Sequence, residues 1–396
     1  MRVVGIVCEY NPFHKGHAYQ LREARRQCPD AAVVCVQSGD FVQRGEPALF
    51  SKYARAEAAC RCGADLVIEL PLPWSLSSAE RFAAGSVALL ASCGAEAISF
   101  GSESGDVPAL SALSRYLASD ACLADIRALM RETPSLSFAA ARERAARTAL
   151  GDLASLLRSP NDNLAVEYLR AAERQGLSLR AIPVKRTGAA HDSRENAAFL
   201  SGSLLRDKIR AGEDVRGLLP DEAYQLFSAE IAQGRALLDP SRMEIAILSR
   251  LRMLTENVFR ELPDAEDGAG IRLYEAVRQA ESLEDILAFA RTKRLPEARI
   301  RRMVMGACLG LRPLESGALP PYARVLACGE QGRALLHERR EAQIPFLTKP
   351  AAVRSLGDSA AEIFRLGADA HDFLVLGFGE SARRPGEDWR SGPRLL

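Results

Sequence analysis

The sequence has almost no net charge, no paired-cysteine motif and no apolar run long enough to cross a membrane. Its 396 residues include 52 lysines and arginines against 51 aspartates and glutamates, so binding of nucleic acid would require a local basic patch. The N-terminus has no signal-peptide pattern, and the apolar runs are far shorter than a membrane-spanning helix. We therefore expect a soluble, cytoplasmic protein without a membrane partner.

The cysteine pattern and the missing nucleotide motifs exclude further classes of protein. Nine cysteines, an odd number without C-x-x-C pairs, predict reduced thiols rather than a disulfide framework or a zinc ribbon. The chain has no G-x-x-x-x-G-K-[ST] sequence, which argues against a P-loop nucleotidase, and no G-x-G-x-x-G after its first apolar run, which argues against a dinucleotide-binding domain. No serine or cysteine lies in a recognisable nucleophile elbow.

Short apolar runs alternate with stretches of helical composition through the first half of the chain. The expected strands are residues 3–7, 31–37, 65–70, 96–101 and 178–184, and the expected helices are 14–27, 48–62, 77–93 and 203–211. Continuous apolar strands separated by helices are typical of a parallel sheet that helices cover on both faces. The pattern predicts an α/β fold with a Rossmann-like doubly wound parallel sheet.

Length and composition divide the chain further. The 396 residues, 47% of them hydrophobic, suffice for more than one domain. The segment from about residue 107 to 175 is too long for a single crossover connection between two strands. It predicts a helical insertion within a first domain of residues 1–215. Residues 216–380 predict a mainly α C-terminal domain. Residues 381–396 are rich in arginine, glycine and proline, which predicts a flexible tail.

The sequence HKGH follows the first expected strand and contains two of the five histidines, His14 and His17. If the helix begins near His14, the two imidazoles lie one turn apart beside a helix N-terminus, which attracts anions. Gly16 lets a ligand approach the backbone. The pattern favours a phosphate site. Two alternatives remain: a partial metal site completed by His191 and Asp192, and a pair of histidines that only cap or pack.

The sequence LSGSLLR, residues 200–206, is the second candidate phosphate-binding element. Ser201 or Ser203 can cap a helix there, and Arg206 would lie in its first turns. Hydroxyls, backbone N–H groups and a guanidinium at one helix start form a clamp for a triphosphate. Any serine-rich helix start with an arginine has this appearance, so the prediction depends on its pairing with HKGH.

The two elements resemble the H-x-G-H and I-S-S-T-x-x-R motifs of the HIGH-motif nucleotidyltransferase superfamily, in which ATP is attacked at its α-phosphate. The surrounding sequences resemble the bacterial tRNA(Met) cytidine acetate ligase family over most of the chain. They are GIVCEYNPFHKGH, SGDFVQRGEPALFSKYARAEAA, DLVIELPLPWSLSSAERFA, ISFGSESGD, RSPNDNLAVEYL and TKRLPEARIRRM. The chain departs from the family pattern at Cys8, Asp40 and Asp162.

The resemblance implies a nucleotidyltransferase-type domain and a two-step reaction. Acetate and ATP would give acetyl-adenylate and pyrophosphate, and the acetyl group would pass to N4 of the wobble cytidine of elongator tRNA(Met), giving N4-acetylcytidine. Acetate is already ionised at neutral pH and needs no general base. The missing nucleophilic triad is then expected. ATP and Mg²⁺ are the implied cosubstrate and cofactor, acetate and tRNA are the implied partners, and no metal held by protein ligands alone is expected.

The resemblance also implies roles for individual residues. His14 and His17 would stabilise developing charge, Lys15 would neutralise phosphates, and the serines and arginine of the second element would hold the leaving pyrophosphate. The full expected ATP site is Val7, Cys8, Glu9, Tyr10, Asn11, Pro12, Phe13, His14, Lys15, Gly16, His17, Ala18, Tyr19, Gln20, Gly101, Asn161, Arg186, Ser201, Ser203 and Arg206.

A cluster of basic residues in the second half of the chain is the candidate tRNA-binding surface. It consists of Arg291, Lys293, Arg294, Arg299, Arg301 and Arg302, with Glu297 as the one acid among them. The alternative is a solvated helix face. Two other functions are compatible with parts of the pattern. A small-molecule adenylyltransferase acting on a phosphomonoester would need only the compact α/β domain, and a non-catalytic RNA-binding protein would not need both histidines and the arginine.

Overall fold

Eight strands form one sheet in the computed structural model, which describes residues 1–185 and 200–396. Their order is β10, β8, β5, β2, β1, β6, β7, with β9 beside β8. The parallel strands are β1 (Arg2–Cys8), β2 (Ala31–Ser38), β5 (Leu66–Leu70), β6 (Ala95–Ser102) and β7 (Arg180–Lys185). They coincide with the five strands predicted from apolar runs, so the Rossmann-like α/β prediction is confirmed.

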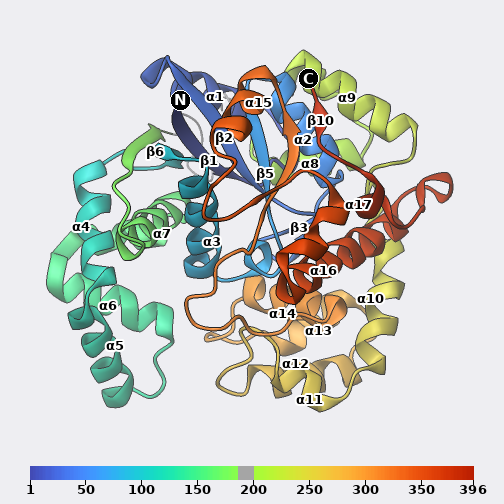
Figure 1. Cartoon of the computed structure of the whole chain (residues 1–396). Coiled ribbons are helices and arrows are strands. Elements are labelled where there is room, and N and C mark those ends of the chain that lie inside the picture. Colours follow the sequence, from blue (N-terminus) through green and yellow to red (C-terminus); the bar gives the residue numbers. More distant parts are fainter. Residues whose placement is uncertain (186–199) are drawn as a thin grey trace.

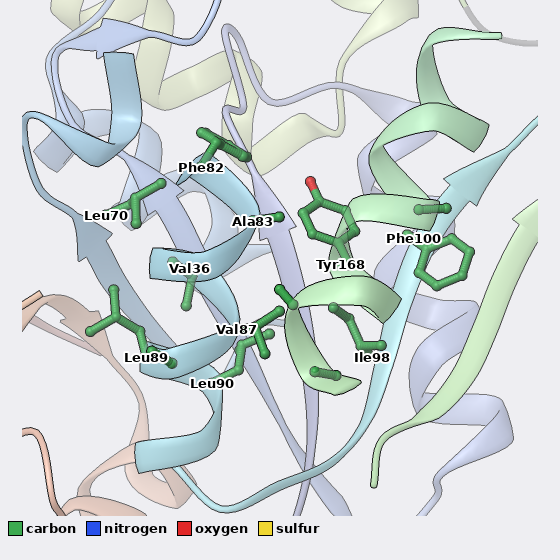
Figure 2. Packing of buried hydrophobic residues seen from close by; sticks show 14 of the residues in the cluster. Val36, Leu70, Phe82, Ala83, Val87, Leu89, Leu90, Ile98, Phe100 and Tyr168 are labelled. Carbon is green, nitrogen blue, oxygen red and sulfur yellow. The ribbon is translucent and has the colours of Figure 1, made fainter. Parts of the chain in front are cut away.

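Helices cover both faces of these strands because alternate residues point to opposite sides of the sheet. The covering helices are α1 (Lys15–Gln27), α2 (Lys52–Arg61), α3 (Ala79–Ser92) and α7 (Pro160–Arg174). Val4 and Ile6 of β1 lie in the core that α1 and α2 cover, whereas Val3 lies in the core on the other face. Figure 2 shows that second core, where Leu90 of α3 and Tyr168 of α7 pack over the sheet.

The chain reverses direction across the sheet at β1, which lies between β2 and β6. In open α/β sheets, ligands bind beyond the carboxyl ends of the strands where the strand order reverses. The loop after Cys8 therefore occupies the position at which this architecture binds ligands. Figure 1 shows β1 and β6 side by side in the upper left part of the view.

The segment between β6 and β7 is the predicted helical insertion. It contains α4 (Val107–Ala118), α5 (Asp120–Glu132), α6 (Phe138–Leu150) and the 3-10 helix η2 (Gly151–Arg158), followed by α7. Asp106, Ser119 and Ser137 cap the first three helices, each accepting a backbone N–H from the first turn. The helices α4, α5 and α6 lie together at one side of the sheet (Figure 1).

Helices also dominate the chain after β7. They are α8 (Gly202–Arg210), α9 (Asp221–Ala232), α10 (Ser241–Met253), α11 (Glu256–Arg260), α12 (Ala269–Gln279), α13 (Leu283–Ala290) and α14 (Glu297–Leu309). The last five pack around one core, in which Leu251, Phe259, Leu273 and Ile300 are fully buried, and residues from other parts of the chain, such as Phe41 and Leu374, join it. The expectation of a mainly α C-terminal part is met over this stretch.

The chain then returns to the sheet, which the sequence did not indicate. The returning elements are β8 (Ala323–Cys328), α15 (Glu330–Glu338), β9 (Phe346–Leu347), η4 (Pro350–Leu356), α16 (Asp358–Leu374), α17 (Glu387–Arg390) and β10 (Arg394–Leu395). β8 is fully buried and runs antiparallel to β5, so the sheet is not wholly parallel. Its six residues are one short apolar run among helical stretches, which is why the periodicity did not separate it from them.

The prediction of a flexible tail over residues 381–396 is wrong. These residues contain α17 and β10, and β10 pairs in parallel with β8. The composition is polar, as expected for a mobile segment, but Asp388 is 0% exposed and bonded to buried cations. Ionic contacts hold the segment where apolar burial does not, and average polarity does not report such contacts.

Candidate functional site

Two histidines shape the loop between β1 and α1. The backbone of His14 is extended and its side chain caps α1, because Nδ1 accepts a hydrogen bond from the Gly16 N–H at 3.0 Å. The Nδ1 of His17 accepts one from the His14 N–H at 3.3 Å, which completes a capping box. The helix begins where the sequence predicted, and both histidine side chains take part in its cap, as the capping alternative expected.

Both imidazole rings have a defined orientation and tautomer. The rings of His14 and His17 stack with centroids 3.7 Å apart, and the Tyr10 ring lies 4.8 Å from that of His17. A neutral imidazole has one acceptor nitrogen and one N–H. Because each Nδ1 accepts a backbone hydrogen bond, each Nε2 carries the N–H. Two oriented donors therefore accompany the N-terminus of α1, where anions are stabilised.

Helix α8 brings the second motif to this loop. Ser201 caps α8, and its Oγ accepts a hydrogen bond from the Leu204 N–H at 3.4 Å. The Nη1 of Arg206 donates to the backbone oxygen of Asn11 at 2.9 Å. A Cβ at Gly202 would lie 3.3 Å from the same oxygen, so a glycine there allows the close approach. The structure thus brings Arg206 of LSGSLLR to the loop that leads into HKGH.

Of the other residues in the first motif, some pack in the core and others make hydrogen bonds to neighbouring elements. Phe13 and Ala18 are buried in the core, so their side chains hold the loop in place. Lys15 is exposed, and its Nζ donates to the backbone oxygen of Gly217 at 2.6 Å. That bond uses one of three ammonium donors. Gln20 donates to the Ser99 oxygen at 3.3 Å, which links α1 to β6.

Gly101 and Asn161 belong to one junction beside β6. Gly101 lies near the carboxyl end of β6 and pairs with Val184 of β7. The Nδ2 of Asn161, at the start of α7, donates to Glu103 Oε1 at 2.7 Å. The neighbouring Asp162 is fully buried and accepts the Ser104 N–H at 3.1 Å. The expected site residues Arg186, His191 and Asp192 lie outside the described residues.

Sequence reasoning missed a buried arginine that supports the site. The guanidinium of Arg55, in α2, donates to the backbone oxygens of Glu9, Gly39 and Phe50, and so joins the loops after β1 and β2. Glu9 accepts the Gln43 N–H at 2.9 Å. Burial raises the pKa of Glu9, although that hydrogen bond and nearby Arg44 act in the opposite direction. The sequence signal that could have revealed Arg55 is a charged residue on the buried face of the alanine-rich helix α2.

A second group that the sequence did not reveal is a buried ionic cluster beside the carboxyl ends of β2 and β5. Its members are Asp40, Lys52, Glu69, Arg324, His371 and Asp388. Lys52 Nζ lies 2.6 Å from Asp388 Oδ2, and Arg324 Nη1 lies 2.7 Å from the same oxygen. His371 Nδ1 lies 2.8 Å from Asp40 Oδ2. The cluster joins α16, α17 and β8 to the loop after β2.

The buried ionic cluster predicts a loss of stability at alkaline pH. Burial alone would lower the pKa of His371, but the Asp40 carboxylate, with Glu387, outweighs it and raises the pKa to about 10. Between an unfolded pKa of about 6.5 and this value, the folded state holds one more proton, so stability falls as pH rises. Chemical denaturation of wild type at pH 6.5 and 8.5 should give a decrease of about 2 kcal/mol in the unfolding free energy.

The matched variant for this pH experiment is His371→Asn, which removes the titrating group. It should be less stable than wild type at pH 6.5 but should show a smaller decrease between the two pH values. Equal decreases in wild type and variant would show that His371 does not carry the proton linkage.

The basic cluster of the second half of the chain is largely engaged within the protein. Arg294 donates to the oxygens of Ser135 and Pro134, each at 2.8 Å. Arg299 donates to the Asp264 oxygen, Arg302 pairs with the Asp264 carboxylate and Arg301 pairs with Glu297. Arg291 and Lys293 are exposed, and Arg291 Nη1 lies 3.7 Å from Glu297 Oε2. The charge available to a partner is therefore smaller than the count of basic residues indicated.

The described part of the chain has no group of three or more histidine, cysteine, aspartate or glutamate side chains that could hold a metal ion. Glu9 is the carboxylate of the first motif's loop. Mg²⁺ in nucleotide sites is held by one or two carboxylates together with substrate phosphates and water. Glu9 supplies one such carboxylate, which fits a magnesium ion that arrives with a nucleotide. Among residues 1–185 and 200–396, no helix is long and apolar enough to cross a membrane.

Comparison with known proteins gives consistent similarities. A family model described as HIGH nucleotidyl transferase matches residues 1–386. The tRNA(Met) cytidine acetate ligase of Syntrophomonas wolfei is 32% identical over 412 aligned positions, which cover 99% of each chain. The enzyme of the same name from Caldanaerobacter subterraneus is 34% identical over 368 positions, which cover 90% of each chain.

Solved structures agree with these relatives. The apo crystal structure of Thermotoga maritima TmcAL superposes with a TM-score of 0.94 at 30% identity and covers 100% of both chains. A crystal structure of Thermotoga maritima TmcAL bound with alpha-thio ATP superposes with a TM-score of 0.91 at the same identity and coverage. The similarity therefore includes the sheet, the helical insertion and the C-terminal helices.

Proposed function

The chain belongs to the tRNA(Met) cytidine acetate ligase family of the HIGH nucleotidyl transferases, and we propose that this ATP-dependent ligase acetylates N4 of the wobble cytidine of elongator tRNA(Met). The observation that carries the proposal is that the two stacked histidine side chains, the N-terminus of α1 and Arg206 lie at one loop after the carboxyl end of β1. The alpha-thio ATP bound to Thermotoga maritima TmcAL supports a nucleotide site.

The first step is attack of an acetate oxygen on the α-phosphorus of ATP. A new O–P bond forms, the bond to the bridging oxygen breaks, and pyrophosphate leaves with the electron pair. Acetate is already an anion at neutral pH, so the protein has only to orient it and stabilise charge on the phosphates. The Nε2–H groups of His14 and His17 stabilise the negative charge that develops on phosphate oxygens. Glu9 is the carboxylate that would help to hold a Mg²⁺ ion arriving with ATP, and such an ion would neutralise part of the phosphate charge.

Lys15 and the residues of α8 act on the leaving pyrophosphate. Arg206 supplies a charge-assisted donor, and Ser201 and Ser203 place hydroxyls at the start of α8. In the second step, N4 of cytidine attacks the acetyl carbon, the bond to AMP breaks and N4 loses a proton. The amine lone pair is delocalised into the ring, so an activated acyl donor is required. Asn161 and Gly101 complete the proposed nucleotide site, with Arg186.

The exposed part of the basic cluster is the proposed contact for the tRNA backbone. Arg291 and Lys293 follow α13, and Phe289, at the end of that helix, is 48% exposed. Basic residues beside an exposed aromatic ring suit an RNA strand, because phosphates pair with the cations and unpaired bases stack on the ring. The other four arginines of the cluster are held by internal contacts. To meet tRNA they would either change side-chain conformation or attract its phosphates from a longer distance. They are Arg294, Arg299, Arg301 and Arg302.

Reversing the charge of Arg291 and Lys293 to glutamate is expected to weaken tRNA binding and to leave acetate activation unchanged. Each lost phosphate contact should lower the slope of log Kd against log salt concentration by about one. The control reverses Arg127 and Arg131, two exposed residues of α5, so that net charge is equal. An identical slope of log Kd against log salt concentration in the two double variants would show that Arg291 and Lys293 do not contact the tRNA.

The proposed function is tested by acetate-dependent exchange of labelled pyrophosphate into ATP, followed by transfer of labelled acetate to tRNA(Met). Exchange with acetate and label on N4 of the wobble cytidine are expected. Exchange only with a phosphomonoester would identify a small-molecule adenylyltransferase. Binding of ATP and tRNA without exchange in any mixture would identify a non-catalytic RNA-binding protein.

A further inference from the structure

A small hairpin lies between the nucleotide site and the basic helix α14. It consists of β3 (Phe41–Val42) and β4 (Glu46–Pro47), which pair antiparallel. On one side, the Gln43 N–H donates to Glu9 at 2.9 Å, in the loop of the first motif. On the other side, a Cβ at Gly45 would lie 2.4 Å from the backbone of Arg301 in α14. With φ at +82° and no room for a side chain, a glycine is required at this contact.

Glu46 of this hairpin pairs with one arginine from each proposed site. Its Oε2 lies 3.4 Å from Nη2 of Arg206, the arginine of the second motif. Its Oε1 lies 3.4 Å from Nη1 of Arg301, which also pairs with Glu297 at 2.7 Å. One carboxylate is therefore shared between the arginine proposed to hold pyrophosphate and an arginine of the basic cluster. The side chain of Glu46 is 32% exposed, so solvent only partly screens the two pairs.

We infer that Glu46 is a positioning residue that couples the two sites and makes tRNA bind more tightly after pyrophosphate has left. When the phosphates of ATP pair with Arg206, Glu46 loses one of its two cations and turns to Arg301. That arginine then faces two carboxylates, Glu46 and Glu297, and attracts an RNA phosphate less. When pyrophosphate leaves, Arg206 recovers Glu46 and Arg301 becomes available. Coupling of this kind is reciprocal, so bound tRNA lowers the affinity for the triphosphate by the same factor.

The inference rests on the proposed function, and its test is the affinity for tRNA(Met) with and without saturating α,β-methylene-ATP, which cannot release pyrophosphate. Wild type should bind tRNA about two- to fivefold more weakly with the analogue, the range for partly exposed ion pairs. In Glu46→Gln the ratio of the tRNA Kd with the analogue to the Kd without it should approach one. The matched control Glu297→Gln removes the carboxylate that pairs with Arg301 and Arg291 but leaves the Glu46–Arg206 pair intact. It should change the tRNA affinity equally with and without the analogue and so keep the wild-type ratio.

The same ratio in wild type and Glu46→Gln would overturn the inference, because the coupling would then act without Glu46. A ratio of one in wild type would also overturn it. Wild type that binds neither the analogue nor tRNA would instead contradict the proposed function, so the two failures are distinguishable. The reciprocal measurement, analogue affinity with and without tRNA, must give the same factor in each variant.

Discussion

Replacement of His17 by alanine is expected to reduce acetate-dependent exchange of pyrophosphate into ATP by about 10² to 10³-fold. The variant loses the imidazole that is proposed to donate to the phosphates, and removal of a single such donor has this effect in enzymes that stabilise a developing oxyanion. Loss of the capping bond should cost the fold only about 1 kcal/mol. The measurements are exchange rate and thermal unfolding on the same preparation.

Two variants separate the role of the donor from that of the cap. His17→Gln retains a side chain that can cap α1 and an amide N–H, so it should keep wild-type stability and recover part of the rate. His337→Ala makes the same chemical change at an exposed position of α15 and should leave both quantities unchanged. Near wild-type exchange in folded His17→Ala would mean that the histidine pair only caps the helix.

Replacement of Asp388 by alanine is expected to destabilise the protein by about 3 to 5 kcal/mol. Asp388 is 0% exposed and accepts contacts from both Lys52 and Arg324, which would remain buried without that partner. Removing one member of a buried ionic group has a cost of this size because an uncompensated charge stays in the interior. Urea denaturation measures the unfolding free energy.

The control for Asp388→Ala is Asp369→Ala, an exposed aspartate in α16, which should change stability by less than about 0.5 kcal/mol. Because the buried ionic cluster holds the loop after β2, the Asp388 variant should also lose activity at temperatures where it is still mostly folded. A stability equal to that of the control would mean that residues 387–395 are held by β10 alone.

Local patterns in the sequence determined much of the α/β domain. The apolar runs predicted β1, β2, β5, β6 and β7, because a buried parallel strand needs a continuous apolar run. The change from an apolar run to helical composition at His14 predicted the start of α1. HKGH was recognisable as a candidate phosphate motif because its chemistry is contained in neighbouring residues, whereas LSGSLLR became one only through its pairing with HKGH.

Only the tertiary structure decided how distant segments meet. The contact of Arg206 with Asn11, the sharing of Glu46 and the burial of Asp388 each join residues far apart in the chain. Periodicity and composition report the environment of a residue averaged over its neighbours, so they assigned the polar end of the chain to a mobile tail. A buried charge is stabilised by partners that arrive from other elements, and the path of the chain alone determines which partners those are.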